Sequence, residues 1–389
     1  MDIVFLTSRF PYPLNKGDKL RAYHQIKELS KSHSIHLISI SDQKVSKTSL
    51  QELKKFCSTI NIFQLSKAKI IFNLLRGLFN NKPFQVNYFF SNTYKKRIIN
   101  LINTINPDHI FCQLIRCAWY LKEEYKYPKT LDYMDALSKG MQRRIDGSGW
   151  KKLIFSIEFE RLKQFENLSY EFFDKHTIIS KTDRGYIPHE KKESIQVIPN
   201  GIDTDYFKKN NPEPKYDLVF VGNLSYAPNV DAVEYIANHL IDKLCLFKPD
   251  IKILISGSNP SKKILKYASE NITIQDWIPD IRNAYNNGKI FLAPLRIGTG
   301  LQNKLLEAMS LELPCITTKL ANMALGAKNK KELIVAENEK EFVENIAELL
   351  NNHALRQQIG TNARSFVKSN FNWEKSTIEL MNNFSIKRT

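Results

Sequence analysis

The chain has 389 residues, of which 42% are hydrophobic and 25% charged, with 14 Gly and 15 Pro. This length suits two domains of roughly 150–200 residues each, and the composition excludes a collagen-like or disordered chain. Lys and Arg (57) exceed Asp and Glu (40), and the net charge of +17 points to an acidic partner: nucleic acid, a phosphorylated ligand or an anionic membrane.

Short β-branched runs alternate with helical patterns in the first half of the chain. This rhythm predicts an α/β fold, with parallel strands joined by helices in a doubly wound sheet. The predicted strands are residues 3–8, 35–40, 61–65, 109–113, 130–134, 176–180 and 195–199. The first predicted helices are 18–31 and 48–57.

The rhythm restarts after a polar segment that contains proline, residues 208–217. The second series of predicted strands is 217–223, 251–258, 272–278, 289–295, 314–318 and 332–336. The last segment, 371–386, is predicted to be a helix that buries Trp373, Ile378, Leu380, Met381 and Phe384. We therefore expect two Rossmann-like halves, with ligands beyond the carboxyl ends of the strands.

The richest candidate site follows the fourth strand of the second series. Gly298 and Gly300 leave backbone N–H groups accessible, and a helix expected to begin near Leu301 would offer its positive end to a phosphate. On that helix Lys304 can neutralise phosphate charge, and Glu307 can accept hydrogen bonds from a ribose diol. The alternative is a glycine turn followed by a solvated Lys–Glu pair. The apolar stripe expected to be buried comprises Leu301, Leu305, Ala308 and Met309.

A second candidate site follows the first strand. Gly17 would let a ligand approach the backbone, and Lys16 and Arg21 add positive charge. The alternative is that Asp18 caps the helix while the basic residues are solvated.

Two further loops carry polar side chains at strand ends. Asp132 and Asp135 end the strand at 130–134, where carboxylates either orient ligand hydroxyls or form a turn. Asn200 and Gly201 favour a tight turn, so this pair is predicted to be a structural link before the second half.

The sequence gives little support for a metal site or a membrane-spanning helix. The five Cys are scattered without a CxxC, and the eight His form no HExxH. No window reaches about 18 apolar residues, and the N-terminus has no basic region ahead of its apolar run, so a cytoplasmic protein is expected. Residues 67–82 combine apolar and basic side chains, which predicts either a contact with an anionic membrane or a core helix with a solvated basic edge.

Several segments together resemble the family 4 retaining glycosyltransferases of the GT-B fold, and in particular the exopolysaccharide-type sugar transferases of bacteria. They are RFPYPLNKGDKLRAYH (9–24), VIPNGIDTDYF (197–207), FVGNLSYAPNVDAV (220–233), APLRIGTGLQNKLLEAMSLELPCITT (293–318) and FNWEKSTIELMNNF (371–384). The resemblance runs over nearly the whole chain.

The resemblance implies two Rossmann-like domains facing each other across a cleft. Residues 1–200 would be the acceptor domain, with 374–389 crossing back onto it, and residues 201–373 the nucleotide-sugar donor domain. It implies a metal-independent hexosyltransferase without a cofactor. The sugar would move, with retention of configuration, from a nucleotide-diphosphate donor to a hydroxyl of a glycan or lipid-linked acceptor. The protein would be cytoplasmic and peripheral on the inner face of the membrane.

Roles for single residues follow from the same resemblance. Glu307 matches the second glutamate of the family's E-x7-E motif and would hold the ribose, while Lys304 would clamp the diphosphate. Gly17 would approach the diphosphate from the other domain, and Asp18 and Asp135 are assigned to positioning the acceptor. Backbone N–H groups would reach the sugar and diphosphate from Gly298, Thr299, Gly300 and Leu301.

The chain departs from the family pattern at two places. Thr299 stands where the first glutamate of E-x7-E is expected, and Asn223 stands near the usual arginine after the first strand of the second domain. Lys304, Arg296 and Lys16 are then expected to supply the missing positive charge. The alternative functions are a non-catalytic or a polyanion-binding protein of the same fold. No helix-turn-helix, RNP-type strand or zinc finger supports a nucleic-acid partner.

Overall fold

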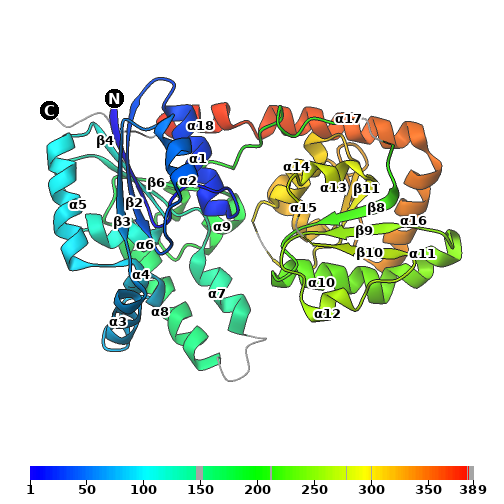
Figure 1. Cartoon of the computed structure of the whole chain (residues 1–389), viewed down its shortest axis with the longest axis horizontal. Coiled ribbons are helices and arrows are strands. Elements are labelled where there is room, and N and C mark those ends of the chain that lie inside the picture. The colour runs from blue at the N-terminus through cyan, green and yellow to red at the C-terminus, as the bar shows by residue number, and fades with distance from the viewer. Residues whose placement is uncertain (146–151, 211–212, 277, 299, 383, 385–389) are drawn as a thin grey trace. The chain divides into compact units, whose positions relative to one another are not determined.

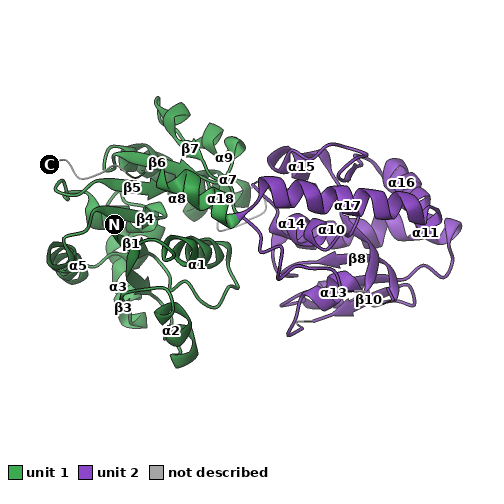
Figure 2. Ribbon diagram, turned by 90° about the horizontal axis from the view of Figure 1, so that it is seen from above, with its two compact units in different colours: residues 1–200, 373–389 green, residues 201–372 purple. Residues whose placement is uncertain are grey.

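The computed structural model describes residues 1–145, 152–210, 213–276, 278–298, 300–382 and 384. The chain divides into two compact units (Figure 2): residues 1–200 with 373–389 form unit 1, and residues 201–372 form unit 2. Each unit is built on a parallel β-sheet covered by helices (Figure 1). The first unit ends at the Asn200–Gly201 pair that the sequence predicts to be a link.

Unit 1 contains a seven-stranded sheet in the order β3-β2-β1-β4-β5-β6-β7. Its strands are β1 (Asp2–Thr7), β2 (Ser34–Ser41), β3 (Thr59–Gln64), β4 (His109–Gln113), β5 (Lys129–Asp132), β6 (Lys175–Ile178) and β7 (Gln196–Val197). Phe5 of β1 lies opposite Leu37 of β2 on one side and Phe111 of β4 on the other. All three side chains are buried, as expected for central strands covered on both faces.

The helices of unit 1 lie between its strands along the chain, singly or in groups, except for α18 at the C-terminal end. They are α1 (Gly17–Leu29), α2 (Lys47–Lys54), α3 (Lys67–Gly77), α4 (Phe84–Phe89), α5 (Asn92–Ile105), α6 (Ile115–Ala118), α7 (Leu137–Ile145), α8 (Lys152–Tyr170), α9 (Lys181–Tyr186) and α18 (Trp373–Met381).

The C-terminal helix α18 belongs to unit 1 although the preceding helix belongs to unit 2. Trp373 stacks on His24 of α1 with ring centroids 4.8 Å apart, and Phe384 stacks on His109 of β4 at 4.3 Å. This confirms the expected return of the C-terminal helix to the N-terminal unit. The expectation for Ile378 is wrong: its side chain is 54% exposed, because it lies on the outer side of the helix.

Unit 2 repeats the arrangement with six strands in the order β10-β9-β8-β11-β12-β13. The strands are β8 (Tyr216–Val221), β9 (Ile253–Ser256), β10 (Ile272–Gln275), β11 (Gly288–Ala293), β12 (Cys315–Thr317) and β13 (Ile334–Val335). The helices are α10 (Ala227–Tyr235), α11 (Ile241–Phe247), α12 (Lys262–Leu265), α13 (Arg282–Asn286), α14 (Asn303–Ser310), α15 (Lys319–Leu325), α16 (Glu339–Asn351) and α17 (His353–Asn370).

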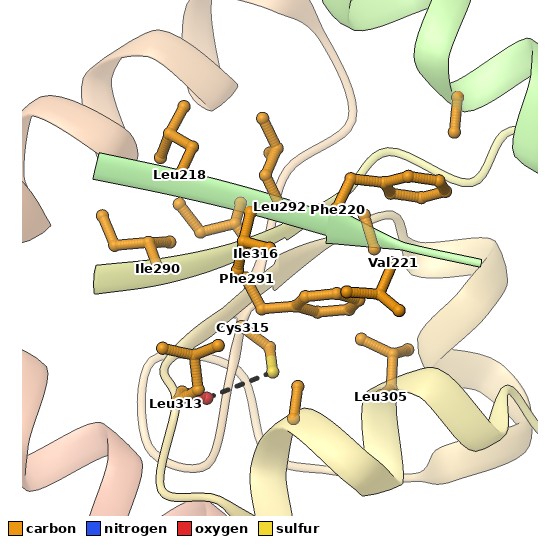
Figure 3. Close-up of a cluster of buried hydrophobic side chains, with 14 of the residues drawn as sticks. Leu218, Phe220, Val221, Ile290, Phe291, Leu292, Leu305, Leu313, Cys315 and Ile316 are labelled. Atoms are coloured by element: carbon orange, nitrogen blue, oxygen red, sulfur yellow. Dashed lines mark hydrogen bonds between the residues drawn. The ribbon is translucent and has the colours of Figure 1, made fainter. Parts of the chain in front are cut away.

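The core of unit 2 fixes the helix that carries the richest candidate site (Figure 3). Leu305 of α14 is buried against the sheet side chains drawn there, among them Val221 and Phe291. In the same cluster the Cys315 thiol donates a hydrogen bond of 3.3 Å to the backbone oxygen of Leu313. Because Leu305 points to the sheet, the neighbouring positions 304 and 307 are directed elsewhere.

Each strand predicted from the sequence overlaps a strand of the structure. In both sheets the chain first builds outward on one side, then returns to add strands on the other side. The order reverses between β1 and β4 in unit 1 and between β8 and β11 in unit 2. Such switch points are where open parallel sheets bind ligands, beyond the carboxyl ends of the strands.

Candidate functional site

The switch point of unit 2 gathers several of the predicted donor-binding residues. The loop after β8 runs through Asn223 to the start of α10, and the loop after β11 runs through Gly298 to the start of α14. The two loops meet where a Cβ atom placed on Gly298 would lie 3.3 Å from Pro228 of α10. Two segments about 70 residues apart in sequence therefore form one surface.

Lys304 lies at the centre of this surface. Its ammonium group donates a hydrogen bond to Oδ1 of Asn229 and lies 5.3 Å from the ring centroid of Phe220. Burial lowers the pKa of Lys304 to about 8, although the nearby Glu307 favours the charged form. Among the described residues no carboxylate lies within ion-pair distance of this ammonium. A half-buried cation without a counter-ion suits an anionic ligand.

Glu307 lies one turn further along α14. Its Oε2 accepts a hydrogen bond of 2.6 Å from the hydroxyl group of the buried Tyr285 on α13. Burial raises the pKa of Glu307, while Tyr285 and Lys304 oppose that shift. The sequence did not indicate Tyr285, since its contact depends on how α13 and α14 pack around β11. A carboxylate oriented in this way can accept hydrogen bonds from a diol.

The glycine loop before α14 has a backbone that only glycine adopts readily. Gly298 has φ +109° and Gly300 has φ +78°. The helix itself begins at Asn303, two residues after the start expected near Leu301, so Gly300 and Leu301 precede the first helical residue. Thr299 lies outside the described residues.

Two of the predicted donor-binding side chains already have partners within unit 2. Arg296 forms a two-pronged ion pair with Asp231 of α10, at 2.7 and 3.1 Å, and its guanidinium lies 4.5 Å from the Tyr235 ring centroid. Asn223 accepts hydrogen bonds from the backbone N–H and the hydroxyl of Ser225, at 3.0 and 2.8 Å. Asn223 therefore shapes its own turn, and Asp231 compensates the charge of Arg296, which leaves Lys304 as the main local cation.

The switch point of unit 1 holds Lys16, Gly17 and Asp18. Gly17 is the first residue of α1, and a Cβ atom placed on it would meet nothing within 4 Å. Asp18 is not the helix cap, because it lies inside the first turn and its carboxylate accepts a 2.6 Å hydrogen bond from Arg9. Arg116, which follows β4, lies 3.8 Å from the same carboxylate. Local sequence gives no sign that Arg9 and Arg116 meet, since only the β1–β4 pairing brings them together.

Other charged residues near the carboxyl ends of the unit 1 strands differ in their exposure to solvent. Asp132 and Arg21 form a fully buried ion pair of 2.6 Å, so neither is available to a ligand, contrary to the expectation for both. Asp135 lies in the loop between β5 and α7 and is exposed.

Within the described ranges, no three His, Cys, Asp or Glu side chains are grouped so that they could hold a metal ion. The helices in the part of the chain that the structure describes include none long and apolar enough to cross a bilayer.

Comparison with known proteins finds relatives of this chain. A family described as glycosyl transferases group 1 matches residues 215–352, which span both switch-point loops of unit 2. An uncharacterised 44.6 kDa protein of the cps region of Klebsiella pneumoniae is 24% identical, over 96% of this chain and 97% of that relative. The capsular polysaccharide biosynthesis glycosyltransferase CapM of Staphylococcus aureus is 28% identical, over 51% of this chain and 58% of its own length.

Solved structures share the fold at lower identity. Anabaena Alr3699/HepE in complex with UDP superposes with a TM-score of 0.68 at 13% identity, covering 98% of this chain and 99% of that one. This likeness confirms the expected fold class of two Rossmann-like α/β domains. The chain thus has the two-domain fold of GT-B glycosyltransferases, and residues 215–352 of its second unit are similar to the glycosyl transferases group 1 family.

Proposed function

We propose that this protein is a metal-independent, retaining glycosyltransferase of family 4. It moves a hexose from a nucleotide-diphosphate sugar to a hydroxyl of a glycan or lipid-linked acceptor in polysaccharide or glycoconjugate synthesis. The observation that carries the proposal is the placement of Lys304 and Glu307 beside a glycine loop at the switch point of unit 2. These residues lie inside the segment matched by the group 1 glycosyl transferases. The relationship to CapM and the fold shared with HepE, which was solved with UDP, support the same reading.

In the proposed reaction, cleavage of the anomeric bond leaves negative charge on the departing diphosphate. Lys304 and the backbone N–H groups around Gly298 and Gly300 stabilise that charge more strongly in the transition state than in the ground state. Glu307, held by Tyr285, accepts hydrogen bonds from the ribose hydroxyls of the donor.

On unit 1, we assign donor contact through Lys16 and Gly17 and acceptor positioning to Asp18 and Asp135. The open space at Gly17 supports close approach of a ligand to the backbone. Asp18 is held between Arg9 and Arg116. The leaving phosphate can take the acceptor proton, so no protein base is required.

The test is a panel of UDP- and GDP-sugars, followed by thermal shift and by release of the free nucleotide. We expect one donor class to raise the melting temperature of the wild type by mass action. Glu307→Gln should weaken that shift and lower kcat/KM for the donor by about 10- to 100-fold, since a hydrogen bond to a charged group contributes roughly 1.5–3 kcal/mol. Product anomers resolved by NMR test retention.

Two outcomes would contradict the proposal. Stabilisation by a donor without any sugar transfer or hydrolysis indicates a non-catalytic protein. If wild type and Glu307→Gln show the same thermal shift and the same use of the donor, this carboxylate does not belong to the site. Glu312→Gln is the matched control, because this carboxylate follows α14 and lies 3.8 Å from Arg364, with no contact to Tyr285.

A further inference from the structure

Helix α3 exposes an unusually large apolar surface. Its inner stripe, Ile70, Asn73, Leu74 and Gly77, faces unit 1, where Asn73 donates hydrogen bonds to the backbone oxygens of Tyr88 and Phe90 at 3.3 and 2.8 Å. The outer stripe is also apolar but is not covered by other parts of unit 1. It continues into the two residues that follow the helix, and its members, with their exposed fractions, are Ile71 (59%), Phe72 (64%), Leu75 (56%), Leu78 (58%) and Phe79 (89%).

This exposure contradicts one of the two interpretations of residues 67–82, the core helix with a solvated basic edge. A core helix with a solvated basic edge would bury these apolar side chains, whereas here they are exposed. Large exposed apolar surfaces mark interaction sites.

The first turns of α8 add to the same surface. Arg161 of α8 donates a hydrogen bond of 2.7 Å to the backbone oxygen of Gly77, which joins α8 to the end of α3. Ile157 and Leu153 lie one and two turns before Arg161, on the same side of the helix, and Leu153 is 70% exposed. We call the outer stripe of α3 together with Leu153, Ile154 and Ile157 the apolar face.

Exposed basic residues lie on the two helices of this face. The segment 53–107 contains nine Lys and Arg residues and no Asp or Glu, so it accounts for more than half of the net charge of +17. Lys67 and Arg76 are exposed on α3 itself, and Lys152 is exposed at the start of α8. Glu158 of α8 is turned inward, since it accepts hydrogen bonds from the backbone N–H groups of Phe84 and Gln85.

The face also lies at the functional end of unit 1. In Figure 1 the strands run downward from the N-terminus, and α3 and the start of α8 extend below the strand ends. This is the carboxyl edge of the sheet, where Asp18, Arg116 and Asp135 lie.

We propose that the apolar face docks on the surface of an anionic lipid bilayer. Phe72, Leu75, Leu78 and Phe79 enter the interfacial region, and the exposed lysines and arginines of the two helices pair with acidic headgroups. An apolar insertion accompanied by cations matches a bilayer of anionic lipid, which offers both environments at once. Docking in this orientation holds the acceptor edge of unit 1 close to the lipid surface.

The test is flotation of the full-length protein with vesicles of phosphatidylcholine alone or with 30% phosphatidylglycerol, a fraction of roughly the size found in anionic membranes. We expect binding to the mixed vesicles that weakens as salt rises, and little binding to phosphatidylcholine. The double variant Phe72→Ser/Phe79→Ser should reduce binding by at least about tenfold. Lys67→Gln/Arg76→Gln should reduce it less and flatten the salt dependence.

The matched control for the apolar variant is Leu246→Ser/Met323→Ser in unit 2, because these side chains are 87% and 63% exposed, close to the values for Phe79 and Phe72. The control for charge is Lys330→Gln/Lys331→Gln, two exposed lysines of unit 2. Since every substituted side chain in the variants and controls is exposed, an unchanged melting temperature confirms that each protein is folded.

Three results would overturn the proposal. The first is equal flotation of the Phe72/Phe79 variant and its control. The second is the absence of vesicle binding together with a dimer that Phe79→Ser dissociates, which would assign the face to a second copy of this chain. The third is retention of a nucleic acid by wild type, lost in Lys67→Gln/Arg76→Gln, without vesicle binding. Flotation needs no sugar donor, so its failure is distinct from failure of the proposed transferase activity.

Discussion

The hydroxyl group of Tyr285 donates a 2.6 Å hydrogen bond to Oε2 of Glu307. Tyr285 lies on α13, before β11, and Glu307 lies on α14, after β11 and its following loop. The packing of these two helices beside the strand therefore brings the two side chains together. The bond fixes one carboxylate oxygen of Glu307, which is partly buried. This burial raises the pKa of Glu307. Its removal is therefore a direct test of whether orientation of Glu307 matters.

We expect Tyr285→Phe to raise the KM for the nucleotide-sugar donor by roughly 5- to 30-fold. Loss of one hydrogen bond to a carboxylate corresponds to about 1–2 kcal/mol. The change should fall mainly on KM, since the ribose is bound similarly before and during the reaction. Steady-state kinetics with varied donor provide the measurement, and the exposed Tyr125→Phe serves as control. An unchanged KM would mean that Glu307 needs no such support.

The pH dependence of donor use is expected to follow Lys304. Its pKa is lowered to about 8, so its ammonium is charged below that pH and neutral above it. We expect kcat/KM for the donor to fall by up to about tenfold for each pH unit above 8, as the cation that faces the diphosphate is lost. Lys304→Arg keeps its charge and should remove this decline, whereas Lys304→Met should be low at every pH. If kcat/KM of Lys304→Arg declines above pH 8 as it does for the wild type, the decline is caused by the titration of another group.

Gly17→Ala separates a structural role for this glycine from a ligand-binding one. The added Cβ meets no protein atom within 4 Å, and alanine favours a helix over glycine by up to about 1 kcal/mol, so the melting temperature should stay or rise. Donor turnover should nevertheless fall, because the methyl group occupies space assigned to the diphosphate. Gly140→Ala on α7, also without a neighbour within 4 Å, is the control that should keep full activity. Full activity of Gly17→Ala would remove this loop from the site.

Glu166 should make the stability of unit 1 depend on pH. This buried residue accepts hydrogen bonds from the hydroxyl and backbone N–H of Ser138, and burial raises its pKa from 4.5 to about 7. A raised folded-state pKa favours the protonated form, so its stabilising effect is complete below about pH 4.5 and is lost as pH rises through 7.

Glu166→Gln is therefore expected to be more stable than the wild type above pH 7, by at most about 3 kcal/mol, and equal to it near pH 4.5. Urea unfolding at several pH values measures the difference. Glu160→Gln, an exposed residue of the same helix, should leave the free energy of unfolding unchanged. A pH-independent gap between Glu166→Gln and the wild type would contradict the assigned pKa.

The sequence by itself determined the two sheets, because strands covered on both faces must be continuous apolar runs, such as residues 3–8 and 217–223. It also placed Gly298, Lys304 and Glu307 after a strand, where parallel sheets bind ligands. The start of α14 was less well determined, since Leu301 continues the apolar spacing although the backbone becomes helical only at Asn303.

Only the tertiary structure decided which charged side chains are free to meet a ligand. Arg21 and Asp132 lie 111 positions apart and are indistinguishable in sequence from solvated residues, yet they form a fully buried pair. Arg296 is matched by Asp231, whereas Lys304 has no carboxylate within ion-pair distance in the described part of the chain. Likewise, the apolar spacing of α3 fits burial or exposure equally well. Partners distant in the chain set the electrostatic energy and the solvent access of each group, and local sequence does not encode those distances.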